Sequence, residues 1–221
     1  MPKLDRDGDV FVLHLDPDDE NRFHPDWLAA VETALDEVDA AAGPKALVVA
    51  GAGKFWSTGL DLDWMMANGE AAPAYLDRVN LLLARTLASA PVTVAAVNGH
   101  AFGAAAMWAL AHDIRVMRSD RGYFCLPEVD LGLEFAPGMM ALCKSRLTPA
   151  TAHEAMTTGR RYGGEQALAA GIVEAVADAD HVLAAAIDLA RPLAAKATPV
   201  RTRIKEALYA EALTALRTPS L

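Results

Sequence analysis

Three carboxylates stand close together in the segment CLPEVDLGLEFAPG, residues 125–138: Glu128, Asp130 and Glu134. Their neighbours include leucines, a valine and a phenylalanine, so the segment is apolar enough to enter a core. An ionised carboxylate in a core is costly unless it is paired or hydrogen-bonded. Buried carboxylates also have raised pKa values, which suits them to acid–base catalysis. The segment is therefore the first candidate for chemistry, and the open question is which of the three belongs inside.

The spacing of residues excludes several other functional motifs. In GAGKFWSTG, residues 51–59, a phosphate loop would need glycine at Val48 and a hydroxyl residue at Phe55, and a dinucleotide loop would need glycine at Trp56. The six histidines and two cysteines show no His-x-x-x-His or Cys-x-x-Cys spacing, so no metal site is predicted. Asp61 and Asp63 do not share a helix face and are interpreted as solvated or capping carboxylates. Ser57 lies in no Gly-x-Ser-x-Gly elbow.

Two turns of small residues open helices directly after apolar strands. FWSTGLDL, residues 55–62, follows KALVVAG, and VNGHAFGAAAMWAL, residues 97–110, overlaps the end of VTVAAV. A helix N-terminus presents unpaired N–H groups, and two such turns side by side could aim two donors at one oxygen. Small residues also permit close packing of a helix on a sheet. The spacing leaves both interpretations open.

The elements that must position these turns alternate between strand and helix. Strands are predicted over 9–16, 45–51, 92–99, 113–119, 123–127 and 172–176. Helices are predicted over 21–43, 60–69, 74–90, 103–112, 138–147, 150–158, 165–171, 180–196 and 199–216. This alternation indicates an α/β fold with a mainly parallel sheet. We expect one core domain, residues 1–196, with a helical appendage over residues 197–221 after a break at Thr198-Pro199.

Composition narrows the function classes. The 221 residues are 53% hydrophobic and carry a formal charge of −9. The longest basic run is Arg160-Arg161, so nucleic-acid binding is not expected. No apolar run is long enough to span a membrane, and no secretory leader is recognisable, so we expect a cytoplasmic protein with two buried thiols. The final tripeptide PSL is a poor match to a peroxisomal address.

Taken together, five segments resemble the crotonase superfamily, the enoyl-CoA hydratases and isomerases. They occur in the family's order along nearly the whole chain: ENRFHPDWLAAVETALDEVD, AGKFWSTGLDLDWM, VNGHAFGAAAMWALAHDIRVM, LPEVDLGLEFAPG and GRRYGGEQALAAGIVEAV. The resemblance implies a crotonase-like spiral of repeated β-β-α units with C-terminal helices. It also implies assembly as a homotrimer or a dimer of trimers.

The resemblance assigns roles residue by residue. The oxyanion-hole N–H groups fall on Leu60 and Ala104, where the family usually has glycine in place of Ala104. Acyl-CoA would lie along the chain largely through backbone contacts, with coenzyme A as part of the substrate and no separate cofactor. The residues implied for this binding are Arg22, Phe23, Thr58, Gly59, Leu60, Asp61, Leu62 and Gly103.

The carboxylates decide which reaction the resemblance implies. Hydratases of the family carry two acidic residues, and the first of those positions is Met107 here, whereas the second is Glu128. A single carboxylate resembles the Δ3,Δ2-enoyl-CoA isomerases, in which one base moves a proton from C2 to C4 as in fatty acid β-oxidation. Asp130 is interpreted as structural.

Two alternatives stay open. Glu134 would serve as a second acid in a hydratase or another crotonase reaction if it reached the acyl pocket, and otherwise it is a surface residue. A non-catalytic acyl-CoA binder with the same fold is the third hypothesis. Acyl chain length depends on how residues 64–66 and 135–140 line the pocket for the acyl tail.

Overall fold

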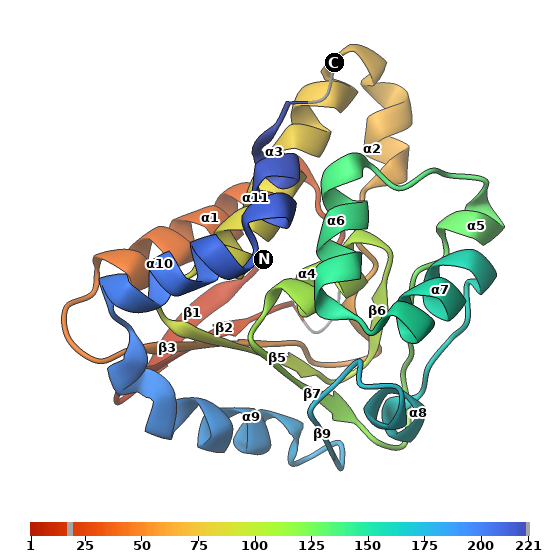
Figure 1. The fold of residues 1–221 in the computed structure, drawn as a ribbon. Coiled ribbons are helices and arrows are strands. Elements are labelled where there is room, and N and C mark those ends of the chain that lie inside the picture. The colour runs from red at the N-terminus through yellow and green to blue at the C-terminus, as the bar shows by residue number, and fades with distance from the viewer. Residues whose placement is uncertain (17–19, 220–221) are drawn as a thin grey trace.

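A parallel sheet with helices on both faces forms the body of the computed structural model, which describes residues 1–16 and 20–219 (Figure 1). Its six strands are arranged in the order β1-β2-β3-β5-β7-β9, and only the β1–β2 pair is antiparallel. The strands are β1 Lys3–Asp7, β2 Val10–His14, β3 Ala46–Ala50, β5 Val92–Val97, β7 Ile114–Arg118 and β9 Ala175–Ala177. The predicted α/β fold with a mainly parallel sheet is confirmed.

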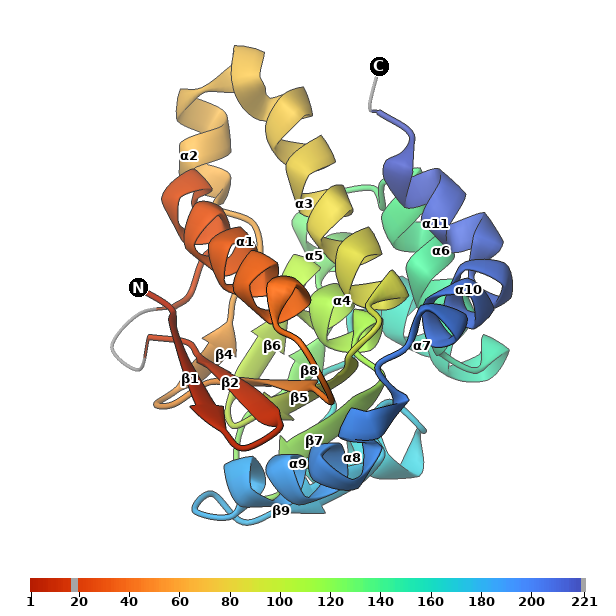
Figure 2. The same cartoon turned by 90° about the vertical axis from the view of Figure 1, so that its left-hand side faces the viewer.

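The two faces of the sheet belong to two separate cores, because successive strand residues point to opposite faces. Along β2, Phe11 and Leu13 enter the larger core beneath most of the helices. Val10 and Val12 enter the smaller core on the other face, under α9 Val182–Ala190 and the 3₁₀ segment η2 Arg191–Lys196. Figure 2 shows α9 on one side of the sheet and α1, α3 and α4 on the other. Strands buried on both faces explain the continuous apolar runs of the sequence.

A second, three-stranded parallel sheet carries the turns of interest. It consists of β4 Phe55–Ser57, β6 His100–Phe102 and β8 Phe124–Cys125, in that order. The chain runs from β3 to β4, from β5 to β6 and from β7 to β8, with a helix after each pair. This is a spiral of repeated β-β-α units, as the resemblance to the crotonases implies.

The helices pack around these two sheets and bring distant parts of the chain together. They are α1 Pro25–Ala40, α2 Leu62–Ala67, α3 Ala72–Ala88, α4 Ala104–Ala111, α5 Glu128–Leu131, α6 Pro137–Arg146, α7 Pro149–Thr158, α8 Gly164–Ala169, α10 Pro199–Leu208 and α11 Ala210–Arg217, with a 3₁₀ turn at Gly69–Ala71. Within the described residues, no helix has the length and apolarity that a membrane span requires. Both cysteines are buried free thiols, as predicted.

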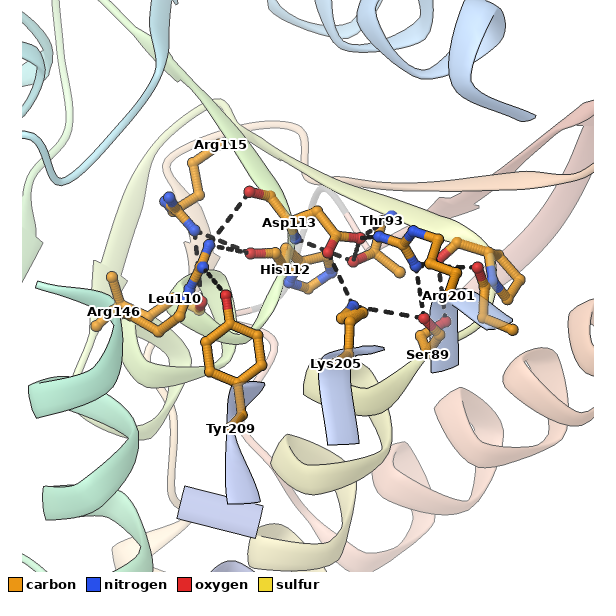
Figure 3. Close-up of polar contacts among 12 residues, drawn as sticks. Ser89, Thr93, Leu110, His112, Asp113, Arg115, Arg146, Arg201, Lys205 and Tyr209 are labelled. Carbon is orange, nitrogen blue, oxygen red and sulfur yellow. Dashed lines mark hydrogen bonds and ion pairs between the residues drawn. The ribbon is translucent and has the colours of Figure 1, made fainter. Parts of the chain in front are cut away.

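A buried polar network docks α10 and α11 against the body (Figure 3). Asp113, just before β7, pairs with Arg201 at 2.7 Å and Lys205 at 2.8 Å, both from α10. Arg146 of α6 donates to the Tyr209 hydroxyl at 2.6 Å, at the junction of α10 and α11. Beyond that junction, α11 places three side chains in the larger core: Ala212, Leu213 and Leu216. The C-terminal helices are thus fixed to the core; the division at residue 197 stays a prediction.

Several expectations about elements were wrong in detail. The predicted turn FWSTGLDL, residues 55–62, begins with β4, and β1, β6 and α5 were not predicted. The helix expected over 199–216 is broken at Tyr209, whose φ of −110° and ψ of 25° are not helical. The three-residue strands β4 and β6 show too little alternation to be recognised. The last two residues of the predicted appendage and of the PSL tripeptide, 220–221, lie outside the described residues.

Candidate active site

Glu128 is the carboxylate that belongs inside. It begins α5, three residues after the end of β8, and only 9% of the residue is exposed. Its Oε2 atom is buried and has no hydrogen-bond partner among the described residues. Burial raises the pKa of Glu128 to about 6, and its own backbone N–H offsets only part of that rise. Near neutral pH, the side chain can therefore both accept and return a proton.

The turn before α4 lies beside this carboxylate. Gly103 caps the helix with φ 54° and ψ −125°, a conformation that side chains rarely adopt. A β-carbon added to Gly103 would lie 3.4 Å from Oε1 of Glu128, so the bare glycine makes room for the carboxylate. The next residue, Ala104, is the first of α4, and no described residue accepts a hydrogen bond from its N–H. The positive end of α4 thus lies close to Glu128.

The second turn touches the first. Gly59 has φ 83°, and a β-carbon added there would lie 2.9 Å from the amide nitrogen of Ala104. Leu60 follows, and its N–H also lacks a hydrogen-bond acceptor in residues 1–16 and 20–219. Two unpaired backbone donors therefore stand on neighbouring turns, one of them beside a buried carboxylate. This is the arrangement from which an oxyanion hole can be built.

The other carboxylates of the segment are exposed. Glu134 is exposed in the coil between α5 and α6. Asp130 lies on the outer side of α5, where its carboxylate fills the space above Gly159: a β-carbon added to that glycine would meet it at 2.6 Å. Met107, at the position of the hydratases' other acid, is 1% exposed and belongs to the core. Within the described residues of this chain, Glu128 is the buried carboxylate at the two turns.

The residues implied for acyl-CoA binding lie mainly in two segments: the loop at Arg22 and Phe23, and the stretch that follows β4. Arg22 lies at the surface, and hydrogen bonds to Asp63 and Glu20 raise its pKa. Phe23 is fully buried and stacks on Trp27 at 4.9 Å between ring centroids, so its side chain cannot line a surface groove. Its N–H donates to the Gly59 carbonyl at 2.8 Å and ties this loop to the turn.

The stretch after β4 is held from several sides. The N–H of Thr58 donates to the Glu20 carbonyl at 3.0 Å, and Asp61 caps α2 by accepting from the Trp64 N–H at 3.1 Å. This confirms the capping interpretation of Asp61. Leu62 begins α2 and is 37% exposed.

Sequence reasoning missed Tyr75 and the role of Ser57. The hydroxyl of Tyr75 accepts from the Asp61 N–H at 3.0 Å, one residue beyond Leu60, and burial raises the pKa of Tyr75 to about 12. Ser57 is fully buried; it donates to the Asn21 carbonyl at 2.6 Å and accepts from the Gly59 N–H at 3.1 Å. Both hydroxyls fix the backbone around Leu60. Helical spacing places Tyr75 on a buried face, but nothing in the sequence indicates its partner.

Known proteins match the chain over nearly its whole length. Residues 6–219 match the family described as enoyl-CoA hydratase/isomerase. Enoyl-CoA delta isomerase 3 of Arabidopsis thaliana is 36% identical, with 96% of this chain and 93% of that protein covered. The peroxisomal enoyl-CoA delta isomerase 2 of the same plant is 34% identical, with 96% and 93% covered.

Solved structures agree with the sequence relatives. The crystal structure of the probable enoyl-CoA hydratase EchA3 of Mycobacterium tuberculosis superimposes with a TM-score of 0.90 at 27% identity, covering 98% of this chain and 91% of the other. The β-β-α spiral, the paired turns and these relatives lead to one conclusion. The chain belongs to the enoyl-CoA hydratase/isomerase family and is an enzyme with the crotonase fold.

Proposed function

We propose that this enzyme is a Δ3,Δ2-enoyl-CoA isomerase that uses Glu128 as its single proton shuttle. The observation that carries the proposal is the buried carboxylate of Glu128: its Oε2 has no partner among the described residues, and its Oε1 lies beside the Gly103 turn. The core residue Met107 stands where hydratases of the family have a second acid, and Glu134 is exposed. Relatives named delta isomerases, at 36% and 34% identity, support the same reaction.

The reaction needs one base and one anion site. With the thioester oxygen between the N–H groups of Leu60 and Ala104, removal of a C2 proton by Glu128 sends the electron pair onto that oxygen. The resulting dienolate collapses as Glu128 returns the proton to C4, so the double bond moves from C3=C4 to C2=C3. Two backbone donors stabilise the charge only while it exists, and one such donor contributes roughly 10²–10³ in turnover. No net proton is gained or lost.

The backbone that supplies the Leu60 donor would also bind coenzyme A. Coenzyme A would lie along Arg22 and Thr58 to Leu62 as part of the substrate, so that no separate cofactor is needed. Phe23 would contribute through its backbone and by holding the loop. A homotrimer or dimer of trimers is proposed from the family resemblance, and light scattering of the purified protein would measure it. The cytoplasmic location stays a prediction, since one relative is named peroxisomal.

The test uses two substrates and the ultraviolet absorbance of the conjugated thioester. We expect a rise in absorbance with a 3-enoyl-CoA and no fall with a 2-enoyl-CoA. Glu128→Gln keeps the shape of the side chain but cannot take the proton, so turnover should drop about 10²–10⁴-fold. The matched control is Glu134→Gln, which should retain full activity.

Two results would overturn the proposal. A fall with the 2-enoyl-CoA would mean that water is added, and loss of that activity in Glu134→Gln would make Glu134 the second acid. Binding of acyl-CoA without turnover of either thioester would make the protein a binder that has lost the chemistry.

A further inference from the structure

Asn80 is a buried amide that the proposed reaction does not use. It lies in α3 between Val79 and Leu81, and only 3% of the residue is exposed. Its Oδ1 is buried with no hydrogen-bond partner in the described part of the chain. A buried polar atom left without a partner destabilises the fold, so such atoms need an explanation.

A pocket of about 490 Å³ adjoins this amide. Three elements form its walls: α3, the beginning of α6 and the end of α11. The lining residues are Asn80, Ala136, Pro137, Gly138, Ala215, Thr218 and Pro219. None of them is charged, and apart from Asn80 and Thr218 their side chains are apolar. The pocket therefore suits an apolar ligand that carries one neutral polar group, and its volume falls in the range of small-molecule sites.

The walls of the pocket lead back to the candidate active site. Ala136–Gly138 follow the segment that begins at Glu128, and α3 carries both Asn80 and Tyr75, whose hydroxyl holds the Asp61 N–H. Leu76, one helical turn before Asn80 on the same face of α3, packs against the same core cluster as Leu60 and Ala136. This apolar lining offers an acyl chain a route from the thioester site near Leu60 toward the pocket.

We propose that this pocket takes the distal end of the acyl chain and that Asn80 hydrogen-bonds a hydroxyl group carried there. The inference rests on the proposed function and adds the substrate class: hydroxylated, unsaturated acyl thioesters of coenzyme A. A hydroxyl group both donates and accepts, so it satisfies the carboxamide whichever end of the amide faces it. A charged group at that end would find no counter-ion among the lining residues.

The test compares three substrates in three proteins. The substrates are a short-chain 3-enoyl-CoA, a medium-chain 3-enoyl-CoA and the same medium chain with a terminal hydroxyl group. Asn80→Leu has nearly the same shape but cannot hydrogen-bond. We expect this variant to lower the ratio of kcat/KM for the hydroxylated over the plain medium chain about 3- to 10-fold. Turnover of the short chain should not change.

A second variant tests the pocket itself. Ala215→Leu, on the α11 wall, fills the space without changing its polarity, and should slow both medium-chain substrates while sparing the short one. An unchanged ratio in Asn80→Leu would overturn the role of Asn80. Equal slowing of short and medium chains by Ala215→Leu would overturn the assignment of the pocket to the acyl tail.

Binding separates this inference from the proposed reaction. Dissociation constants of saturated medium-chain acyl-CoAs, with and without the terminal hydroxyl, need no turnover. We expect the hydroxylated ligand to lose affinity about 3- to 10-fold in Asn80→Leu relative to the plain one, even if the isomerase assay fails. Equal losses for both ligands would contradict the inference while leaving the isomerase reaction unaffected.

Discussion

Asp113 and Glu128 are both largely removed from solvent, and their surroundings give the two carboxylates opposite properties. Asp113 accepts from the backbone N–H of Thr93 at 2.8 Å and pairs with Arg201 and Lys205. Burial alone would raise the pKa of Asp113, but the charges of Lys205 and Arg201 outweigh burial and lower it. No cation of the residues that the structure describes pairs with Glu128, and burial raises the pKa of Glu128 to about 6. Nearby positive charges therefore compensate the desolvation of Asp113, whereas the desolvation of Glu128 is left uncompensated.

The difference separates a structural site from a chemical one. At the base of α10, Arg201 and Lys205 pair with Asp113 and also donate to the Ser89 carbonyl, which fixes the C-terminal helices in one place (Figure 3). At the two turns, a carboxylate oxygen and two backbone N–H groups have no partner within the described part of the chain. Unsatisfied buried groups reduce stability, and they persist at sites where a substrate supplies the missing partner.

The largest expected effect on stability comes from removing the negative charge of Asp113. Asp113→Asn leaves Lys205, whose side chain is 7% exposed, and Arg201 without a counter-ion. Breaking such a buried pair costs about 3–5 kcal/mol. The free energy of unfolding, measured with urea at pH 8, should fall by that amount. A loss below about 1 kcal/mol would mean that the network does not hold α10.

The next effect concerns the turn at Gly103. Gly103→Ala forces a methyl group into a strained conformation and toward Oε1 of Glu128. We expect kcat/KM to fall about 10²-fold, because the Ala104 N–H and the carboxylate lose their alignment. Gly43→Ala is the matched control: Gly43 has φ 82°, but nothing lies within 4 Å of its added β-carbon. Both variants should lose about 1–3 kcal/mol of stability, whereas equal loss of activity in the two would contradict a special role for Gly103.

The smallest effect is a gain in stability. The pKa of Glu128 is higher in the folded state than its ordinary value of 4.5, so stability is lost as pH rises from about 4.5 through 6. Glu128→Gln removes that loss, and should raise the free energy of unfolding at pH 8 by about 1–2 kcal/mol, with a smaller gain toward pH 4.5. The pKa of Asp113 is lowered in the folded state, so its contribution to stability is instead lost as pH falls. Glu134 is exposed, so Glu134→Gln should change the free energy of unfolding little. A gain in Glu128→Gln alone would support the raised pKa of Glu128.

Much of the fold could be predicted from the sequence because its signals are local. Apolar runs such as KALVVAG mark strands buried on both faces, and Pro25, Pro137 and Pro199 stand in the first turns of their helices. The short strands β4 and β6 could not be found, because their pairing depends on neighbours brought together by the spiral.

The candidate site was predictable only in part. The two turns could be named because small residues after apolar strands fit an oxyanion hole, and Glu128 and Gly103 were singled out by the resemblance to the crotonases. The contacts made by Tyr75, Ser57 and Asn80 could not, since each depends on which distant element packs against it. The burial of Phe23 was likewise hidden, because an aromatic residue next to Arg22 is equally consistent with a binding loop and with a core.

The pH dependence of kcat/KM is the most direct test of Glu128 as the base. A 3-enoyl thioester of pantetheine lacks the phosphates of coenzyme A, so its own ionisation does not obscure the profile. If Glu128 is the base, kcat/KM should fall tenfold per pH unit below about 6 and be level above it, in the wild type and in Glu134→Gln alike. A profile that stays level from pH 8 down to pH 5 would show that Glu128 is not the group that takes the proton.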